Sequence, residues 1–290
     1  MRATARRGDE VTASAPEPLY VAARAVLLDA LEALGPQREA LIVVGAQAVY
    51  LRTGDGGIAV APYTTDADLV LSPAELAEAP RVEELMCQAA FRQEGNPGAW
   101  AKTVQVGDDE VDVPVDLMVP ERFAPPGGRR GVRLPPHDKM AARKARGLEG
   151  AILDNDPCEV TGLDGSDPRR FVVRVAGPAA LVAAKLHKLR DRLDEGADDR
   201  IADKDAADVY RLMLATPVED FLARLRPLLA DDRAGPPCRE AVVLLGGLFG
   251  APAARGVEMA VRSLRVAVPA ERIAAVCTGF VRLVAAGLEA

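Results

Sequence analysis

Residues 40–71 read ALIVVGAQAVYLRTGDGGIAVAPYTTDADLVL, and this stretch decides the fold. The apolar run 40–44 closes on Gly45 and indicates a short buried strand. Residues 46–53 follow it directly with a helical pattern, and residues 64–71 are predicted to form a second strand. The order strand, tight turn, helix, strand predicts a unit in which α and β elements alternate.

Two carboxylates stand two residues apart on the second predicted strand. Asp66 and Asp68 should point to one face with Cα atoms roughly 6 to 7 Å apart, a spacing from which both can reach one cation. Hard oxygen ligands favour Mg²⁺ or Mn²⁺, and such ions bridge triphosphate oxygens in phosphoryl and nucleotidyl transfer. Gly45 would let the backbone approach a phosphate at the start of the following helix. A solvated surface pair of aspartates is the competing interpretation.

The patterns on either side of this stretch predict an α+β fold. We expect a disordered tail over residues 1–16, a mixed sheet with flanking helices over residues 17–176, and a helical domain over residues 177–290. In the first part we expect a helix over 17–34, a helix beginning at Ser72 and Pro73, two strands within 103–119, a loop crossing over 120–150 and a strand over 171–175. The helices expected in the second part are 178–194, 201–214, 218–231, 239–249, 252–266 and 269–288.

A third carboxylate is expected on the strand that ends at Val119. Asp116 could lie beside the first two aspartates, and Asp112, on the same face of that strand, is the alternative. Both could instead face solvent. Pro114 between them cannot donate a ladder hydrogen bond, so it predicts an edge position or a bulge.

Two later helices carry charges at suggestive positions. On the helix over 178–194, Lys185, Lys188 and Arg192 form a cationic ridge beside the apolar stripe, where a triphosphate could lie. Snorkelling lysines are the plainer interpretation. On the next helix Asp205 should face inward and pair with Lys185 or Arg192, which favours it for a site role, while Asp208 is expected in a surface pair or a helix–helix contact.

These residues together resemble a known family. The sequence from Val44 to Tyr50, followed by Thr65-Asp66-Ala67-Asp68, is similar to the motif of the DNA polymerase β-like nucleotidyltransferase superfamily. With residues 178–192 and 204–212 added, residues 40–215 resemble the AbiEii-type (MenT-like) nucleotidyltransferase toxins. Ala46 stands where that family usually has glycine or serine, so phosphate binding would rest on backbone amides and on Thr64 or Thr65. The long loop that begins at Gly54 is a candidate lid.

The resemblance implies a nucleotidyltransferase-like fold and a Mg²⁺-dependent or Mn²⁺-dependent transfer of a nucleotide from a nucleoside triphosphate. It also implies tRNA as the acceptor and a cognate antitoxin as partner. The metal ligands would be Asp66, Asp68 and Asp116. The nucleotide-binding residues would be Gly45, Ala46, Thr65, Lys188 and Arg192. The catalytic residues would be Asp66, Asp68, Asp116, Lys185 and Asp205, in which Asp116 or Asp205 activates the acceptor hydroxyl.

Composition narrows the remaining classes. The net charge of −7 gives no bulk attraction for nucleic acid, and the local basic runs over 129–133 and 139–146 are the place where such a substrate would bind. The four cysteines and two histidines lack zinc spacing. No signal peptide or membrane-length apolar run is present, so we expect a cytoplasmic protein without membrane contact. Trp100 and Phe91 are expected to pack in the core, although Trp100 beside Lys102 could stack a nucleobase.

Two other functions stay open. A non-catalytic nucleotide-binding or partner-binding module with the same fold is favoured by Ala46 and the long loop. A sugar-nucleotide glycosyltransferase could use the Asp-x-Asp pair for manganese, but no second nucleotide-binding half of the expected length is present.

Overall fold

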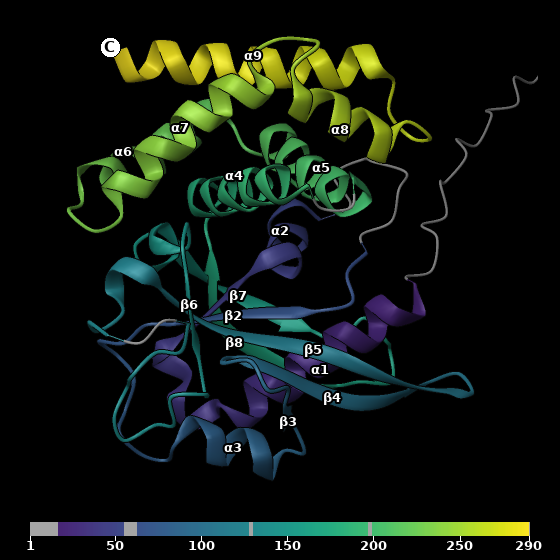
Figure 1. Ribbon diagram of the computed structural model, residues 1–290. Helices are drawn as coiled ribbons and strands as arrows, with labels where there is room; N and C mark the ends of the chain where they lie inside the picture. Colours follow the sequence, from purple (N-terminus) through teal and green to yellow (C-terminus); the bar gives the residue numbers. More distant parts are fainter. Residues whose placement is uncertain (1–16, 55–62, 128–129, 197–198, 290) are drawn as a thin grey trace, which may run out of the picture.

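The computed structural model describes residues 17–54, 63–127, 130–196 and 199–289, and in this part of the chain the fold is mixed α+β (Figure 1). The strands are β1 (Leu41–Val44), β2 (Ala67–Leu71), β3 (Arg92–Gln93), β4 (Ala99–Val106), β5 (Asp109–Pro120), β6 (Arg143–Ala145), β7 (Asn155–Thr161) and β8 (Arg170–Ala176). The helices are α1 (Pro18–Ala33), α2 (Gly45–Thr53), α3 (Val82–Gln88), α4 (Pro178–Glu195), α5 (Asp199–Ala215), α6 (Val218–Ala230), α7 (Gly235–Phe249), α8 (Arg255–Leu264) and α9 (Ala270–Glu289). Short 3₁₀ turns are η1 (Gly35–Ala40), η2 (Glu121–Phe123) and η3 (Glu149–Ile152).

The described strands form one mixed sheet in the order β3-β4-β5-β2-β1-β8-β7, and β6 pairs with β5 off this path. Strand β1 lies near the middle, antiparallel to β2 and parallel to β8. All four of its residues are buried, as expected for an apolar run covered on both faces. Strand β2 is parallel to β5, which places Asp68 directly opposite Asp116. The order of the strands therefore brings the two aspartate-bearing segments side by side.

Strand β5 changes its neighbour along its length. It is antiparallel to β4 from Asp109 to Asp116 and parallel to β6 from Met118 to Pro120. Pro114 lies in the first part, opposite Ala101 of β4, and the pairing with β2 begins only at Val115. The strand is therefore an edge at Pro114 on the β2 side, which is the position expected for a residue without an N–H group.

Helices cover both faces of the sheet (Figure 1). Helix α1 packs under β2, β4, β5 and β8 and contacts α3, whereas α2, α4 and α5 pack together above the sheet. Helices α6 and α7 pack on α4, and α8 and α9 pack on α5, forming the outer layer. Helix α4 begins with proline at its first turn and ends at Gly196 in the left-handed conformation, so its boundaries follow from standard start and stop residues.

The predicted elements agree with the structure in most places and differ in three. The helix expected at Ser72 and Pro73 is wrong, because these residues form a turn and α3 begins only at Val82. Strands β3, β6 and β7 were not expected, and β2 begins at Ala67, so Asp66 immediately precedes it. The expected tail 1–16 and most of the candidate lid after Gly54 lie outside the described residues. In the described residues, no helix is long and apolar enough to span a membrane.

Candidate active site

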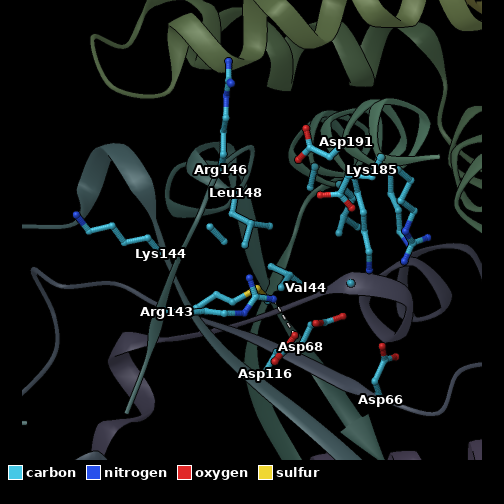
Figure 2. A pocket seen from close by; sticks show the side chains of 18 residues that line it. Val44, Asp66, Asp68, Asp116, Arg143, Lys144, Arg146, Leu148, Lys185 and Asp191 are labelled. Carbon is cyan, nitrogen blue, oxygen red and sulfur yellow. Dashed lines mark hydrogen bonds and ion pairs between the residues drawn. The ribbon is translucent and has the colours of Figure 1, made fainter. Parts of the chain in front are cut away.

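Three aspartates converge on one cavity above the sheet (Figure 2). Asp68 is in β2, Asp116 is its partner across the parallel ladder in β5, and Asp66 comes from the residue before β2. The cavity has a volume of about 470 Å³, and all three carboxylates line it. Because neighbouring parallel strands are about 4.8 Å apart, the ladder alone brings two of the three carboxylates into reach of one cation.

Gly45 packs directly against the Asp68 carboxylate. The residue begins α2 immediately after β1, and Val44 pairs with Asp68 across the ladder. Its φ is +70°, and a Cβ atom there would lie 1.9 Å from Asp68 Oδ2. Two independent constraints, the left-handed backbone and the missing space, therefore require glycine at this position. We expected Gly45 to let a phosphate approach the backbone. In the structure the group that packs against Gly45 is the Asp68 carboxylate.

Asp68 is the one buried side chain among the three aspartates. Burial raises the pKa of Asp68 to about 6, and the neighbouring Asp66 carboxylate adds to this rise. Within the described residues, its oxygens have no hydrogen-bond or ion-pair partner. The chemistry of a buried carboxylate beside two others suits a hard divalent cation, although no group of three or more such ligands in the described residues is already arranged to hold a metal ion.

Thr64 and Gln47 hold Asp66, and of the two only Gln47 was not singled out in the sequence. Thr64 is buried, and its hydroxyl donates a short hydrogen bond to Asp66 Oδ1. Gln47 of α2 is also buried, and its amide nitrogen donates to the Asp66 backbone carbonyl at 3.0 Å. Thr64 is thus committed to the carboxylate and not open to a phosphate, whereas Thr65 is exposed. In the sequence, the position of Gln47 two residues after Gly45 was the only sign that a polar side chain could support Asp66.

Lys185 is fixed between two carboxylates of α5. Its Nζ lies 2.8 Å from Asp205 Oδ1 and 2.6 Å from Asp208 Oδ2, and all three side chains are buried. Burial alone would lower the pKa of Lys185, but the two carboxylates outweigh it and hold the pKa above its usual value. Arg192 also pairs with Asp205 through a short contact. The ion pairs join α4 to α5 beside the three aspartates.

The expected roles of the two α5 aspartates change accordingly. Of the two roles expected for Asp208, the surface pair is wrong and the helix–helix contact is confirmed, because its side chain is buried and forms an ion pair with Lys185 of α4. Both oxygens of Asp205 are engaged, one by Lys185 and one by Arg192. Burial would raise the pKa of Asp205, but Lys185, Lys188 and Arg192 hold it below its usual value. This geometry favours positioning of the cations over proton acceptance by Asp205.

The basic segment after residue 139 reaches the same cavity. Strand β6 places Arg143 opposite Met118, and its guanidinium binds Asp116 Oδ2 at 2.8 Å, the interaction drawn in Figure 2. Lys144 and Arg146 also line the cavity. Arg143 was grouped with the basic run in the sequence, but its contact with Asp116 depends on a strand that was not predicted.

The structure gathers the predicted site residues around two adjoining cavities. The first is lined by Gly45, Asp66, Asp68, Asp116, Lys185, Lys188 and Arg192. The second, of about 580 Å³, is lined by Ala46, Thr65, Asp205 and Asp208, and shares Asp66, Asp68, Lys185, Lys188 and Arg192 with the first. The ridge on α4 therefore stands between the two cavities, above the aspartates.

Two candidates lie elsewhere. Asp112, the alternative third carboxylate, is exposed and pairs with Arg92 at 2.9 Å and with the Thr103 hydroxyl at 2.6 Å. The Trp100 ring is only 2% exposed, and its indole N–H donates to the Ala141 carbonyl at 3.0 Å. Trp100 therefore packs in the core, as does Phe91, and its ring offers no face to a nucleobase.

Comparisons with known proteins add no assignment to this geometry. The sequence matches no protein-family model and no curated protein, and no solved structure matches the fold. Any function must therefore be argued from the residues of the site.

Proposed function

We propose that this chain is a nucleotidyltransferase that uses Mg²⁺ or Mn²⁺ to move a nucleotide from a nucleoside triphosphate to an acceptor hydroxyl. The observation that carries the proposal is the convergence of Asp66, Asp68 and Asp116 beneath a cationic helix. Clustered carboxylates that face lysine and arginine side chains suit a triphosphate and its metal ion, since each part neutralises the other. The motif order glycine, then Asp-x-Asp, supports the same chemistry.

The three aspartates would hold the metal ion, which when bound supplies charge neutralisation at the phosphate oxygens and lowers the pKa of an attacking hydroxyl. Asp116 positions the acceptor hydroxyl and takes its proton, because it lines the first cavity and Asp205 is fully engaged. The acceptor oxygen forms a bond to the α-phosphorus, the bond from that phosphorus to the β-bridging oxygen breaks, and pyrophosphate leaves.

The α4 cations hold the polyphosphate in this scheme. Lys188 is exposed, lines both cavities and has no hydrogen-bond or ion-pair partner among the described residues. Lys185, held by Asp205 and Asp208, fixes α4 against α5 and keeps the neighbouring positive charge in place. Charge-assisted hydrogen bonds from such groups to phosphate are stronger than neutral ones. Lys188 is accordingly the α4 side chain best placed for direct phosphate contact.

The identity of the acceptor does not follow from the donor site. A tRNA acceptor end, a toxin–antitoxin setting and a cognate antitoxin come from the resemblance alone. The basic residues Arg143, Lys144 and Arg146 at the first cavity support an acceptor that carries phosphates. A small-molecule or protein hydroxyl would require the same donor site.

The test is transfer of label from each of the four α-³²P nucleoside triphosphates in the presence of Mg²⁺. Total tRNA is the first acceptor, and the protein alone is the second. We expect label on one of them with the wild-type protein, none with D66N or D68N, and full transfer with D112N, an exposed aspartate outside the cavity. Nucleotide binding without any label would overturn transfer and favour a binding module. Absence of nucleotide binding would overturn both.

A further inference from the structure

Part of the wall of the second cavity comes from residues that were not expected at the site from the sequence. It extends from the Asp66 and Asp68 carboxylates between α2, α5 and α8. Tyr63 lines it from the residues before β2, and Ser263 and Leu264 line it from the C-terminal helix α8. Asp116, the proton acceptor in the proposed reaction, lines only the first cavity. The two cavities therefore share Asp66 and Asp68, and only the first is lined by the acceptor-activating group.

Lys204 is, beside Lys188, a second weakly compensated cation in the second cavity. It is half-buried, and its Nζ lies 5.8 Å from the centre of the Tyr63 ring. Within the described residues it has no hydrogen-bond or ion-pair partner. The adjacent Asp205 does not serve as one, because both of its oxygens bind Lys185 and Arg192. Burial lowers the pKa of Lys204, the sign of a charge that the surroundings do not fully stabilise. An anion bound in this cavity would supply the missing partner.

The cations that line only the first cavity are engaged instead. Arg143 binds Asp116, Lys144 donates to the Gly127 carbonyl at 2.8 Å, and Arg146 pairs with Glu240. The same cavity is also lined by the exposed acidic side chains Asp191 and Glu195. A highly charged triphosphate would have to displace these partners there, whereas Lys188 and Lys204 in the second cavity are open to it.

We infer that the second cavity is the donor subsite, where the phosphates of a nucleoside triphosphate bind Lys188 and Lys204 and the nucleoside lies against Tyr63 and α8. This inference rests on the proposed function and deepens it. The first cavity, with Asp116, is then left to the acceptor. The Tyr63 side chain is 39% exposed, which leaves ring surface for a base.

Helix α8 supplies the selectivity in this arrangement. Ser263 is half-buried on the cavity wall, and its hydroxyl makes no hydrogen bond within the described residues. A serine hydroxyl both donates and accepts, so it can read the polar edge of a base, while the buried Leu264 beside it offers an apolar wall. A site that hydrogen-bonds one base discriminates against a base that lacks the matching group. The C-terminal helices would thereby take part in choosing the nucleotide.

The experiment measures binding, so it does not depend on turnover. Each of the four α,β-methylene nucleoside triphosphates, which cannot release pyrophosphate, is titrated into the full chain with Mg²⁺ by calorimetry. We expect K204A to weaken binding of the preferred nucleotide about tenfold or more, the effect of losing one charge-assisted contact. S263A should reduce the preference among the four bases, and Y63A should weaken binding of all four. K144A tests the first cavity, and K139A, an exposed lysine elsewhere, is the charge-matched control.

The outcomes separate the subsite from the reaction. Weaker binding in K204A with unchanged Kd values in K144A and K139A supports the donor subsite. Unchanged binding in K204A together with weaker binding in K144A places the triphosphate in the first cavity and overturns the inference, while the proposed transfer stands. A wild-type protein that binds none of the four analogues with Mg²⁺ overturns the proposed function and the subsite together. Circular dichroism of each variant separates lost binding from lost folding.

Discussion

Replacing Asp68 with asparagine should make the metal-free protein more stable while it abolishes nucleotide transfer. The pKa of this buried carboxyl is about 6 in the folded protein, against its usual value of 3.8. Above pH 6 the group is ionised in both states and opposes folding, and the opposition fades as the pH falls from 6 towards 4. The shift corresponds to about 3 kcal/mol, or roughly a 6 °C rise in Tm for the variant.

The assay is thermal unfolding in EDTA at pH 8 and at pH 4.5. D68N should melt several degrees above the wild type at pH 8, and the gain should fall to about a third at pH 4.5, where the native carboxyl is almost fully neutral but the unfolded one is still largely ionised. D112N is the matched control, because burial does not strain that exposed aspartate and Thr103 and Arg92 hold its pKa below its usual value. An equal gain at both pH values, or no gain at pH 8, would refute the electrostatic account of Asp68.

Four further substitutions test other parts of the site. K185M removes the lysine from the buried Asp208 and leaves Asp205 with Arg192 alone, so unfolding experiments should show a loss of about 3 to 5 kcal/mol, and a stable variant would contradict the ion-pair geometry. D208N should reduce transfer about tenfold or more in the labelling assay, whereas full activity would return Asp208 to a peripheral role. G45A places a Cβ on the Asp68 carboxylate, so it should remove transfer and Mg²⁺ binding while circular dichroism stays unchanged; normal activity would contradict the packing. D116N should lower kcat about 100-fold or more with unchanged nucleotide affinity, and a change confined to affinity would argue against proton acceptance.

The fold was predictable where one periodicity dominated the sequence. The apolar run of β1 and the helices from α4 to α9 agree with their expected positions to within a few residues. The helix expected at Ser72 failed because Pro80 follows before two turns of helix could be completed and stabilised. Strand β7 escaped notice because it carries Pro157 and several polar residues, which an edge strand paired only with β8 tolerates.

The site was predictable in its carboxylates but not in their surroundings. Asp66 and Asp68 stand out because their spacing is local, and Asp116 because it shares a strand pattern. A helical wheel gives the direction of Asp208 on α5, but it does not show that α4 covers that flank and that Lys185 reaches both aspartates. Lys204, Tyr63 and Ser263 come from three separate segments, so only their tertiary placement reveals that they share a cavity.

The ion pair between Arg143 and Asp116 depends on the register of the three-residue strand β6 against β5. Arg143 faces this carboxylate because it aligns with Met118, which is two residues from Asp116 and on the same face of the sheet. A slip of one residue would turn the guanidinium to the opposite face without altering any side chain of the site. A single insertion or deletion in the segment before Arg143 would then act as an active-site mutation, although it changes none of the aspartates.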